Sequence, residues 1–289
     1  MAASNIEPAA FHLAQYLERA GKLILPRGFA ASFKPPNGGN GKLHVGVDLG
    51  TAYLVLVVLD EHRQPLTGQY RFAQVVRDGL VVDFIGAVDQ LREMKNEVEQ
   101  SLGLELTHAA SGFPPGVPMA EVRAVANVVE AAGMSCSGMI DEPSAANNLL
   151  NLGDGAIIDV GGGTTGIAVI RDGKVVYNAD EATGGTHFSL VIAGALGISF
   201  EEAEELKKNP AEQMRLFPLI RPVMEKVGTI AARHLDGRQV PRVILVGGTC
   251  LFPGIDQVVQ EVTGIPTEVS ANPLLVTPIG IAMHDGQEN

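Results

Sequence analysis

Three short turns contain residues that could bind an anion and a metal ion, and each turn follows an apolar segment. They are Asp48-Leu49-Gly50-Thr51, Asp159-Val160-Gly161-Gly162-Gly163-Thr164-Thr165 and Gly247-Gly248-Thr249. A carboxylate at the end of a strand is a hard oxygen ligand that can hold a hydrated divalent cation. Glycines beyond it let backbone N–H groups approach an anion without interference from a Cβ atom. Two such turns facing each other would hold a polyphosphate from both sides, with Mg²⁺ between them.

The strands and helices that would position these turns can be predicted from the same sequence. An apolar strand, a Gly/Thr turn and a second strand occur at residues 45–59 and again at 156–170, which indicates an internal duplication. Further strands are expected at 69–76, 108–112, 139–140, 174–178 and 243–246. Helices are expected at 85–102, 121–132, from Pro143 onward, and at about 186–197, 200–208, 211–235 and 255–263. This pattern predicts an α/β protein with two related halves.

The composition excludes several kinds of partner and site. Of the 289 residues, 21 are Lys or Arg and 33 are Asp or Glu, a formal net charge of −12, so binding to nucleic acid or to an anionic membrane surface is not expected. No apolar run reaches the roughly 18 residues that a membrane span needs, and the N-terminus lacks the basic segment of a secretory signal. Cys136 and Cys250 are too far apart in sequence for a metal-binding pair, which fits a reducing cytoplasm.

The N-terminal segment has a pattern of its own. Residues 1–25 predict an amphipathic helix, and residues 26–42 predict a linker rich in proline and glycine. In one interpretation the helix packs back on the protein body. In the other it is a docking peptide on a tether, whose apolar face binds in the groove of a partner. The pattern alone leaves both open.

Five motifs resemble those of the actin and 70-kDa heat-shock chaperone ATPase superfamily, and they follow the family's order over residues 43–284. Val45–Thr51 resembles the first phosphate loop of that superfamily, and Ile157–Thr165 resembles the second. Val243–Thr249 resembles its adenosine motif. Asp141–Ala146 resembles its first connecting helix, and Pro278–Ala282 the second. The resemblance implies a two-lobed actin-like fold of the ribonuclease H type, with duplicated mixed-sheet lobes that close over ATP.

Within the superfamily the chain is most similar to the EutJ family of ethanolamine utilization proteins, compact members that are encoded with bacterial microcompartments. The body is short and no peptide-binding domain is appended, and Arg77-Asp78-Gly79 with Asp83-Phe84 resembles a segment of other compact members. The implied first lobe spans 43–155 and includes a C-terminal helix, at about 274–289, that returns to it. The implied second lobe spans 156–273.

The resemblance also implies roles for individual residues. Asp48 and Asp159 would organise Mg²⁺ through water, and Glu142 would help to orient the attacking water. The phosphates of ATP or ADP would be bound by Gly50, Thr51, Gly161, Gly162, Gly163, Thr164 and Thr165, with Gly184 and Gly185 bringing a helix N-terminus near them. Gly247, Gly248 and Thr249 would line the adenosine pocket. Glu204 and Lys207 would contact the nucleoside, although a solvated charged helix face is an equal alternative for their helix.

Some positions depart from the chaperone pattern. Gly166 stands where the chaperones have a further acidic residue, and Ala52 replaces a small hydroxyl residue. No counterpart of the chaperones' phosphate-contacting lysine is evident between Thr51 and Gly86. These differences remove electrostatic stabilisation of a transition state, which is usually the largest catalytic contribution. We therefore expect nucleotide binding with weak or absent ATPase activity.

The resulting hypothesis is a nucleotide-dependent chaperone-like or assembly factor for microcompartment enzymes, with the N-terminal helix as an encapsulation peptide that recruits the protein to the shell. Its partners would be microcompartment enzymes or shell proteins, and it would lie in the cytoplasm, within or on the microcompartment. The main alternative is a bacterial actin-like scaffold or filament protein. A sugar or acid kinase is a third candidate, disfavoured because short insertions leave little chain for a substrate pocket. The sequence leaves the oligomeric state open.

Overall fold

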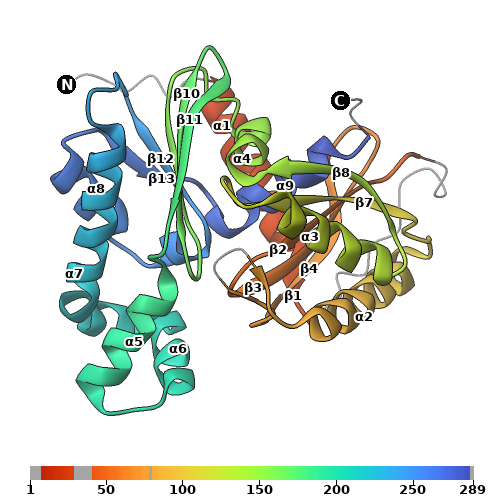
Figure 1. The fold of residues 1–289 in the computed structure, drawn as a ribbon, viewed down its shortest axis with the longest axis horizontal. Helices are drawn as coiled ribbons and strands as arrows, with labels where there is room; N and C mark the ends of the chain where they lie inside the picture. Colours follow the sequence, from red (N-terminus) through yellow and green to blue (C-terminus); the bar gives the residue numbers. More distant parts are fainter. Residues whose placement is uncertain (1–7, 29–40, 78–79, 287–289) are drawn as a thin grey trace.

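The protein consists of two β-sheets with helices between and outside them (Figure 1). A computed structural model describes residues 8–28, 41–77 and 80–286. The strand order is β1-β4-β3-β2-β7-β8 in the first sheet and β11-β10-β9-β12-β13 in the second. Apart from β1, each sheet begins with two antiparallel pairings and continues with two parallel ones, in the same order. The prediction of an α/β fold with duplicated mixed sheets is confirmed.

The bounds of the elements are as follows. The first sheet contains β1 (Ile24–Pro26), β2 (His44–Leu49), β3 (Tyr53–Leu59), β4 (Pro65–Phe72), β7 (His108–Phe113) and β8 (Ser135–Asp141), and the second contains β9 (Gly155–Val160), β10 (Thr165–Arg171), β11 (Lys174–Glu181), β12 (Val243–Val246) and β13 (Thr267–Val269). A small hairpin is formed by β5 (Val76–Arg77) and β6 (Leu80–Val81). The helices are α1 (Pro8–Leu23), α2 (Phe84–Leu102), α3 (Met119–Ala131), α4 (Glu142–Leu150), α5 (Gly185–Leu196), α6 (Phe200–Lys208), α7 (Pro210–Leu235), α8 (Ile255–Thr263) and α9 (Val276–His284), with 3₁₀ turns η2 (Gly248–Leu251) and η3 (Pro273–Leu275).

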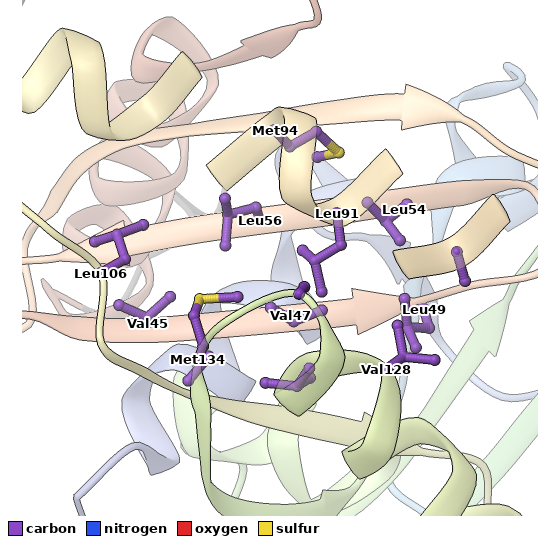
Figure 2. Close-up of a cluster of buried hydrophobic side chains, with 14 of the residues drawn as sticks. Val45, Val47, Leu49, Leu54, Leu56, Leu91, Met94, Leu106, Val128 and Met134 are labelled. Carbon is purple, nitrogen blue, oxygen red and sulfur yellow. The ribbon is translucent and has the colours of Figure 1, made fainter. Parts of the chain in front are cut away.

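Strand β3 shows how one strand serves two layers of the core. Successive side chains of a strand point to opposite faces. Leu54 and Leu56 face the cluster under α2 and α3, where they lie close to Leu91 (Figure 2). Val55 and Val57 face the opposite way, into a cluster shared with α4, α9 and three strands of the second sheet. The middle apolar layer therefore joins the two sheets.

Helices α4 and α9 lie between the sheets and approach each other closely. A Cβ atom added to Gly280 of α9 would lie 1.8 Å from the carbonyl oxygen of Ala145 in α4. On another side of α9, a Cβ atom at Gly46 of β2 would lie 2.5 Å from the backbone nitrogen of Ala282. Only glycine fits at these crossings, so the two glycines allow α9 to lie close to both α4 and β2. A C-terminal helix was expected at about 274–289. In the structure the 3₁₀ turn η3 leads into α9, which ends at His284. Residues 287–289 of the expected range lie outside the described residues.

The buried carboxylate of Asp285 holds the end of α9 against the first sheet. It accepts hydrogen bonds from the N–H of Val45, at 2.9 Å, and from the hydroxyl of Ser137, and it lies 3.1 Å from Nε2 of His108. These partners come from β2, β8 and β7, so one side chain joins three neighbouring strands. No local pattern predicts this cluster, because its members are far apart along the chain.

Helix α1 packs on the protein body in the part whose side chains are described. Leu17 and Ala20 have no exposed surface, and the amide of Asn272 donates to the carbonyl of Leu17 at 2.6 Å. Residues Ile24–Pro26 then form β1, which pairs in parallel with β4. Pro26, expected to begin the linker, is therefore a strand residue, and 29–40 of that linker lie outside the described residues. The packing agrees with the first interpretation of this helix, whereas its role as a targeting peptide stays a prediction.

Other boundaries differ in smaller ways. The strand expected at 69–76 runs from Pro65 to Phe72, and Val76 belongs to the separate β5–β6 hairpin. The expected bounds of β3, β12 and α8 are confirmed. Within the described ranges, the chain has no helix with the length and apolar character needed to cross a bilayer.

Candidate functional site

The β2–β3 and β9–β10 turns of the two sheets meet face to face. A Cβ atom added to Gly162 would lie 2.4 Å from Cβ of Ala52, and one added to Gly163 would lie 2.8 Å from Cγ2 of Thr51. No larger residue fits at either glycine without moving the opposite loop. The sequence-based expectation that these two hairpins confront each other is therefore met by the geometry.

A cavity of about 710 Å³ opens around this contact. That volume is within the range of small-molecule and cofactor sites. Most of the sequence-predicted site residues line it: Asp48, Gly50, Thr51, Glu142, Asp159, Gly161, Gly162, Gly163, Thr164, Gly185, Glu204, Lys207, Gly247, Gly248 and Thr249. The fold thus brings together residues from both sheets and from α4, α5, α6 and η2.

Three carboxyl groups of the cavity hold their protons more tightly than they would in water. Burial, together with the charge of Asp159, raises the pKa of Asp48 to about 7. Burial also raises the pKa of Asp159, although the hydroxyl of Thr277 opposes this by donating to Oδ2 at 2.7 Å. The pKa of Glu142 is raised well above its usual value, by burial first and then by the charges of Asp48 and Asp159. Burial is thus the main cause in all three groups, and repulsion between the carboxylates adds to it for Asp48 and Glu142.

A bound divalent cation would relieve this repulsion, because carboxylates and phosphates are the oxygen ligands that Mg²⁺ prefers. In the described part of the chain, no three His, Cys, Asp or Glu side chains are grouped so that they could hold a metal ion. A cation here would have to complete its shell with water or with oxygens of a ligand. The water-mediated role of Asp48 and Asp159 and the metal itself stay predictions.

The two facing loops also present unused hydrogen-bond donors. Five of their N–H groups have no acceptor among the described residues: those of Thr51, Ala52, Gly162, Gly163 and Thr164. The N–H groups of Gly50 and Gly161 are instead bonded across their own turns, to Tyr53 and Thr164 at 3.0 Å each. Converging backbone donors of this kind form an anion-binding concavity. The loops therefore fit a phosphate group on geometric grounds.

The carbonyl of Gly161 connects the second loop with the other two turns. It accepts the N–H of Gly185 at 3.0 Å and the hydroxyl of Thr249 at 2.7 Å, while the N–H of Thr186 donates to Gly162 at 2.8 Å. The first N–H groups of α5 thus hold the loop in place. Gly185 lines the cavity, but its own N–H is already accepted by a loop carbonyl, and the expected closeness of this helix N-terminus to a phosphate stays a prediction.

Two further predicted ligands do not line the cavity. Thr165 is fully buried, and its hydroxyl donates to the carbonyl of Thr183 at 2.6 Å. Gly184 lies behind the loop, where a Cβ atom would be 2.6 Å from the carbonyl oxygen of Gly161. Both residues support the loop from outside and cannot contact a ligand in the cavity.

Glu204 and Lys207 form a partly buried network that attaches α6 to α5. Nζ of Lys207 donates to the carbonyl of Gly185 at 3.0 Å and to the hydroxyl of Ser189 at 2.9 Å, and it is paired with Glu204. Burial lowers the pKa of Lys207, and only 8% of Glu204 is exposed. The alternative of a solvated charged face is therefore wrong for these two residues, which form part of the cavity wall.

The structure adds cavity residues that the sequence reasoning missed. Nζ of Lys208, on α6, lies 4.9 Å from the ring centroid of Phe72 and 5.9 Å from that of Tyr53, both on the first sheet. The two rings are themselves packed edge to face, with centroids 5.9 Å apart. Arg77 lines the cavity from the β5–β6 hairpin. No sequence spacing relates α6 to Phe72, so only the folded chain reveals this contact between the lobes.

Comparison with known proteins decides the family. Over 259 residues the chain is 42% identical to the ethanolamine utilization protein EutJ of Salmonella typhimurium, an alignment that covers 89% of this chain and 91% of that protein. The chain belongs to the EutJ family. The crystal structure of the EutJ protein from Carboxydothermus hydrogenoformans is 43% identical and superposes with a TM-score of 0.87, covering 95% of this chain and 98% of that one.

More distant similarities concern the fold. The family model for the type IV pilus assembly protein PilM matches residues 143–282 of this EutJ-family chain. The crystal structure of MreB5 of Spiroplasma citri bound to AMPPNP superposes with a TM-score of 0.69 at 18% identity, covering 87% of this chain and 97% of that one. The predicted actin-like fold is thereby confirmed.

Proposed function

We propose that this EutJ-family protein binds ATP and ADP with Mg²⁺ in the cavity between its lobes. The observation that carries the proposal is the meeting of two loops that line one cavity with three carboxyl groups, and whose N–H groups include five without an acceptor among the described residues. The related fold of MreB5 was solved with AMPPNP, which agrees with a nucleotide of this class.

Each part of the cavity would have a distinct task. The N–H groups of the Thr51 and Gly162 loops would bind phosphate oxygens from the two lobes. Asp48 and Asp159 would hold water of the Mg²⁺ shell, and the metal would supply the charge that neutralises the phosphates. Gly247 has φ +90°, and a Cβ atom added to it would clash with the carboxylate of Asp159 and the carbonyl of Val160. A glycine there keeps the adenosine wall close to the metal-binding carboxylate.

Hydrolysis would be slow in this arrangement. Gly166 and Ala52 stand where the chaperones have polar side chains, so fewer groups would stabilise a transition state. The site would therefore keep ATP bound for a long time before hydrolysing it. Nucleotide state could then control the lobes, because the loops that would bind the phosphates lie on different sheets and already touch.

We further propose that this nucleotide-dependent state serves a chaperone-like or assembly function in ethanolamine utilization. The family assignment supports the process, and the partners would be enzymes or shell proteins of a cytoplasmic microcompartment. The protein would bind such a partner differently in its ATP and ADP states.

Nucleotide binding is tested by measuring the dissociation constants of ATP and ADP, with Mg²⁺ and with a chelator, on the full chain. Asp159→Asn should weaken the Mg²⁺-dependent part of the affinity at least tenfold, whereas Asp89→Asn on the exposed face of α2 should leave it unchanged. If the unmodified protein binds neither nucleotide at millimolar concentration, the proposal fails.

The partner function is tested separately by affinity capture from cells growing on ethanolamine, with ATP or ADP present. Recovery of ethanolamine-degrading enzymes or shell proteins in only one nucleotide state is the expected result. Sedimentation of the purified protein with ATP tests the alternative of an actin-like filament. If the protein pellets only with nucleotide and no partner is captured, the filament alternative is favoured.

A further inference from the structure

Arg77 lies on the first-lobe wall of the cavity and is held there by a short hairpin. Its strand, β5, pairs with β6, and the N–H of Val82 donates to Val75 at 2.9 Å, which closes the base of the hairpin. Just upstream, the N–H of Ala73 donates to the carbonyl of Ala52 at 2.9 Å. Ala73, four residues before Arg77, is therefore hydrogen-bonded to the β2–β3 turn, and the hairpin begins just after it.

The charged groups of the cavity differ in how they are engaged. Lys207 and Lys208 are both paired with Glu204, and Lys208 also lies over two aromatic rings. For Arg77, by contrast, no hydrogen bond or ion pair of its side chain is formed with any residue in the described ranges. Among the described residues, therefore, the Arg77 guanidinium has no partner, and its donors face a cavity in which a ligand could accept them.

The position of Arg77 assigns it to one end of a nucleotide. Gly247 and Gly248 line the cavity directly after β12 of the second sheet, and the proposed function takes the wall at Gly247 as the adenosine wall. Arg77, Gln74 and Glu142 line the cavity from elements on the side of the first lobe. A phosphate chain that starts at the second-lobe wall and passes between the facing loops would direct its terminal group toward this first-lobe side.

We propose that Arg77 binds the terminal phosphate of ATP and makes the site prefer ATP to ADP. This inference rests on the proposed nucleotide binding and adds to it the residue that distinguishes the two states. A guanidinium can donate two parallel hydrogen bonds to a phosphate and is always protonated.

The test compares dissociation constants for ATP and ADP, each with Mg²⁺, in the unmodified protein, Arg77→Ala and Arg77→Lys. Loss of charge-assisted hydrogen bonds to the terminal phosphate should weaken ATP binding about tenfold or more in Arg77→Ala. ADP binding should change less than twofold. Arg77→Lys should fall between, since it keeps the charge and loses the paired donors. Arg123→Ala, which removes an exposed arginine from α3, is the matched control and should change neither constant.

The outcomes separate this inference from the proposed function. If the unmodified protein binds both nucleotides and Arg77→Ala leaves the ATP-to-ADP ratio of affinities unchanged, the role of Arg77 is wrong while nucleotide binding stands. An equal loss for ATP and ADP would also overturn it, because a terminal-phosphate contact cannot weaken ADP. Absence of binding in the unmodified protein would refute the proposed function itself. Thermal unfolding verifies that Arg77→Ala is folded, as expected for an exposed side chain.

Discussion

Replacing Asp48 with asparagine should stabilise the protein in the absence of nucleotide, and more so as the pH rises. In the folded protein the pKa of Asp48 is about 7, whereas an aspartate in an unfolded chain has a pKa near 3.9. Folding therefore retains a proton that unfolding releases. For such a group the free energy of unfolding falls as the pH rises from the unfolded to the folded pKa.

The size of the effect follows from that difference. A change of about 3 pKa units corresponds to about 4 kcal/mol at pH 8, as an upper limit. Asp48 lines a cavity and is partly solvated, so we expect about half of this, roughly 2 kcal/mol. Asparagine has a similar shape and no titratable group. Asp48→Asn should therefore melt higher than the unmodified protein by roughly 4–6 °C at pH 8, and by much less at pH 5.

Differential scanning calorimetry at several pH values between 5 and 8, without nucleotide, measures this difference. Asp89→Asn, an exposed substitution of the same chemistry, should show no pH-dependent difference from the unmodified protein. With Mg²⁺ and ATP the unmodified protein should melt higher than Asp48→Asn, because the variant would bind the ligands more weakly and be stabilised less by them. A difference in melting temperature that is constant with pH, or negative at pH 8, would refute the argument that Asp48 is held at an energetic cost.

Three further substitutions test the packing that positions the site. Gly280→Ala should lower the free energy of unfolding by about 3 kcal/mol in urea titrations, since its Cβ would overlap an α4 carbonyl; Gly194→Ala, with open space around it, should be neutral or slightly stabilising. Leu17→Ala should cost about 3 kcal/mol if α1 is part of the core, whereas Leu190→Ala, 54% exposed, should cost less than about 0.5 kcal/mol. Asp285→Ala should cost about 3 kcal/mol by leaving its buried partners without an acceptor, and an unchanged urea midpoint would contradict its role in holding α9.

Local patterns in the sequence predicted the elements and the loops of this protein well. The turn after Asp48 and the turn after Asp159 each follow an apolar strand, and strand and turn signals depend on neighbouring residues. Because the two turns are built alike, the duplication and the shared cavity could be anticipated. The family resemblance then supplied the roles of residues such as Glu142, which no local pattern would have assigned.

What the sequence did not predict depends on contacts between distant segments. Thr165 continues the glycine loop in sequence, but it is the first residue of β10 and its side chain points into the core. Strand β1 exists because β4 offers an edge to Ile24, not because three residues have a strand pattern of their own. Arg77 is placed in the cavity by a hairpin anchored to another loop, and no spacing along the chain reveals that.

The most direct test of the account is a crystal structure of the full chain with Mg²⁺ and a non-hydrolysable ATP analogue. The account predicts that the phosphates lie between the Thr51 and Gly162 loops, within hydrogen-bonding distance of both, with the metal reached through water from Asp48 and Asp159. A nucleotide bound to only one lobe, or a metal-free triphosphate away from these carboxylates, would contradict it.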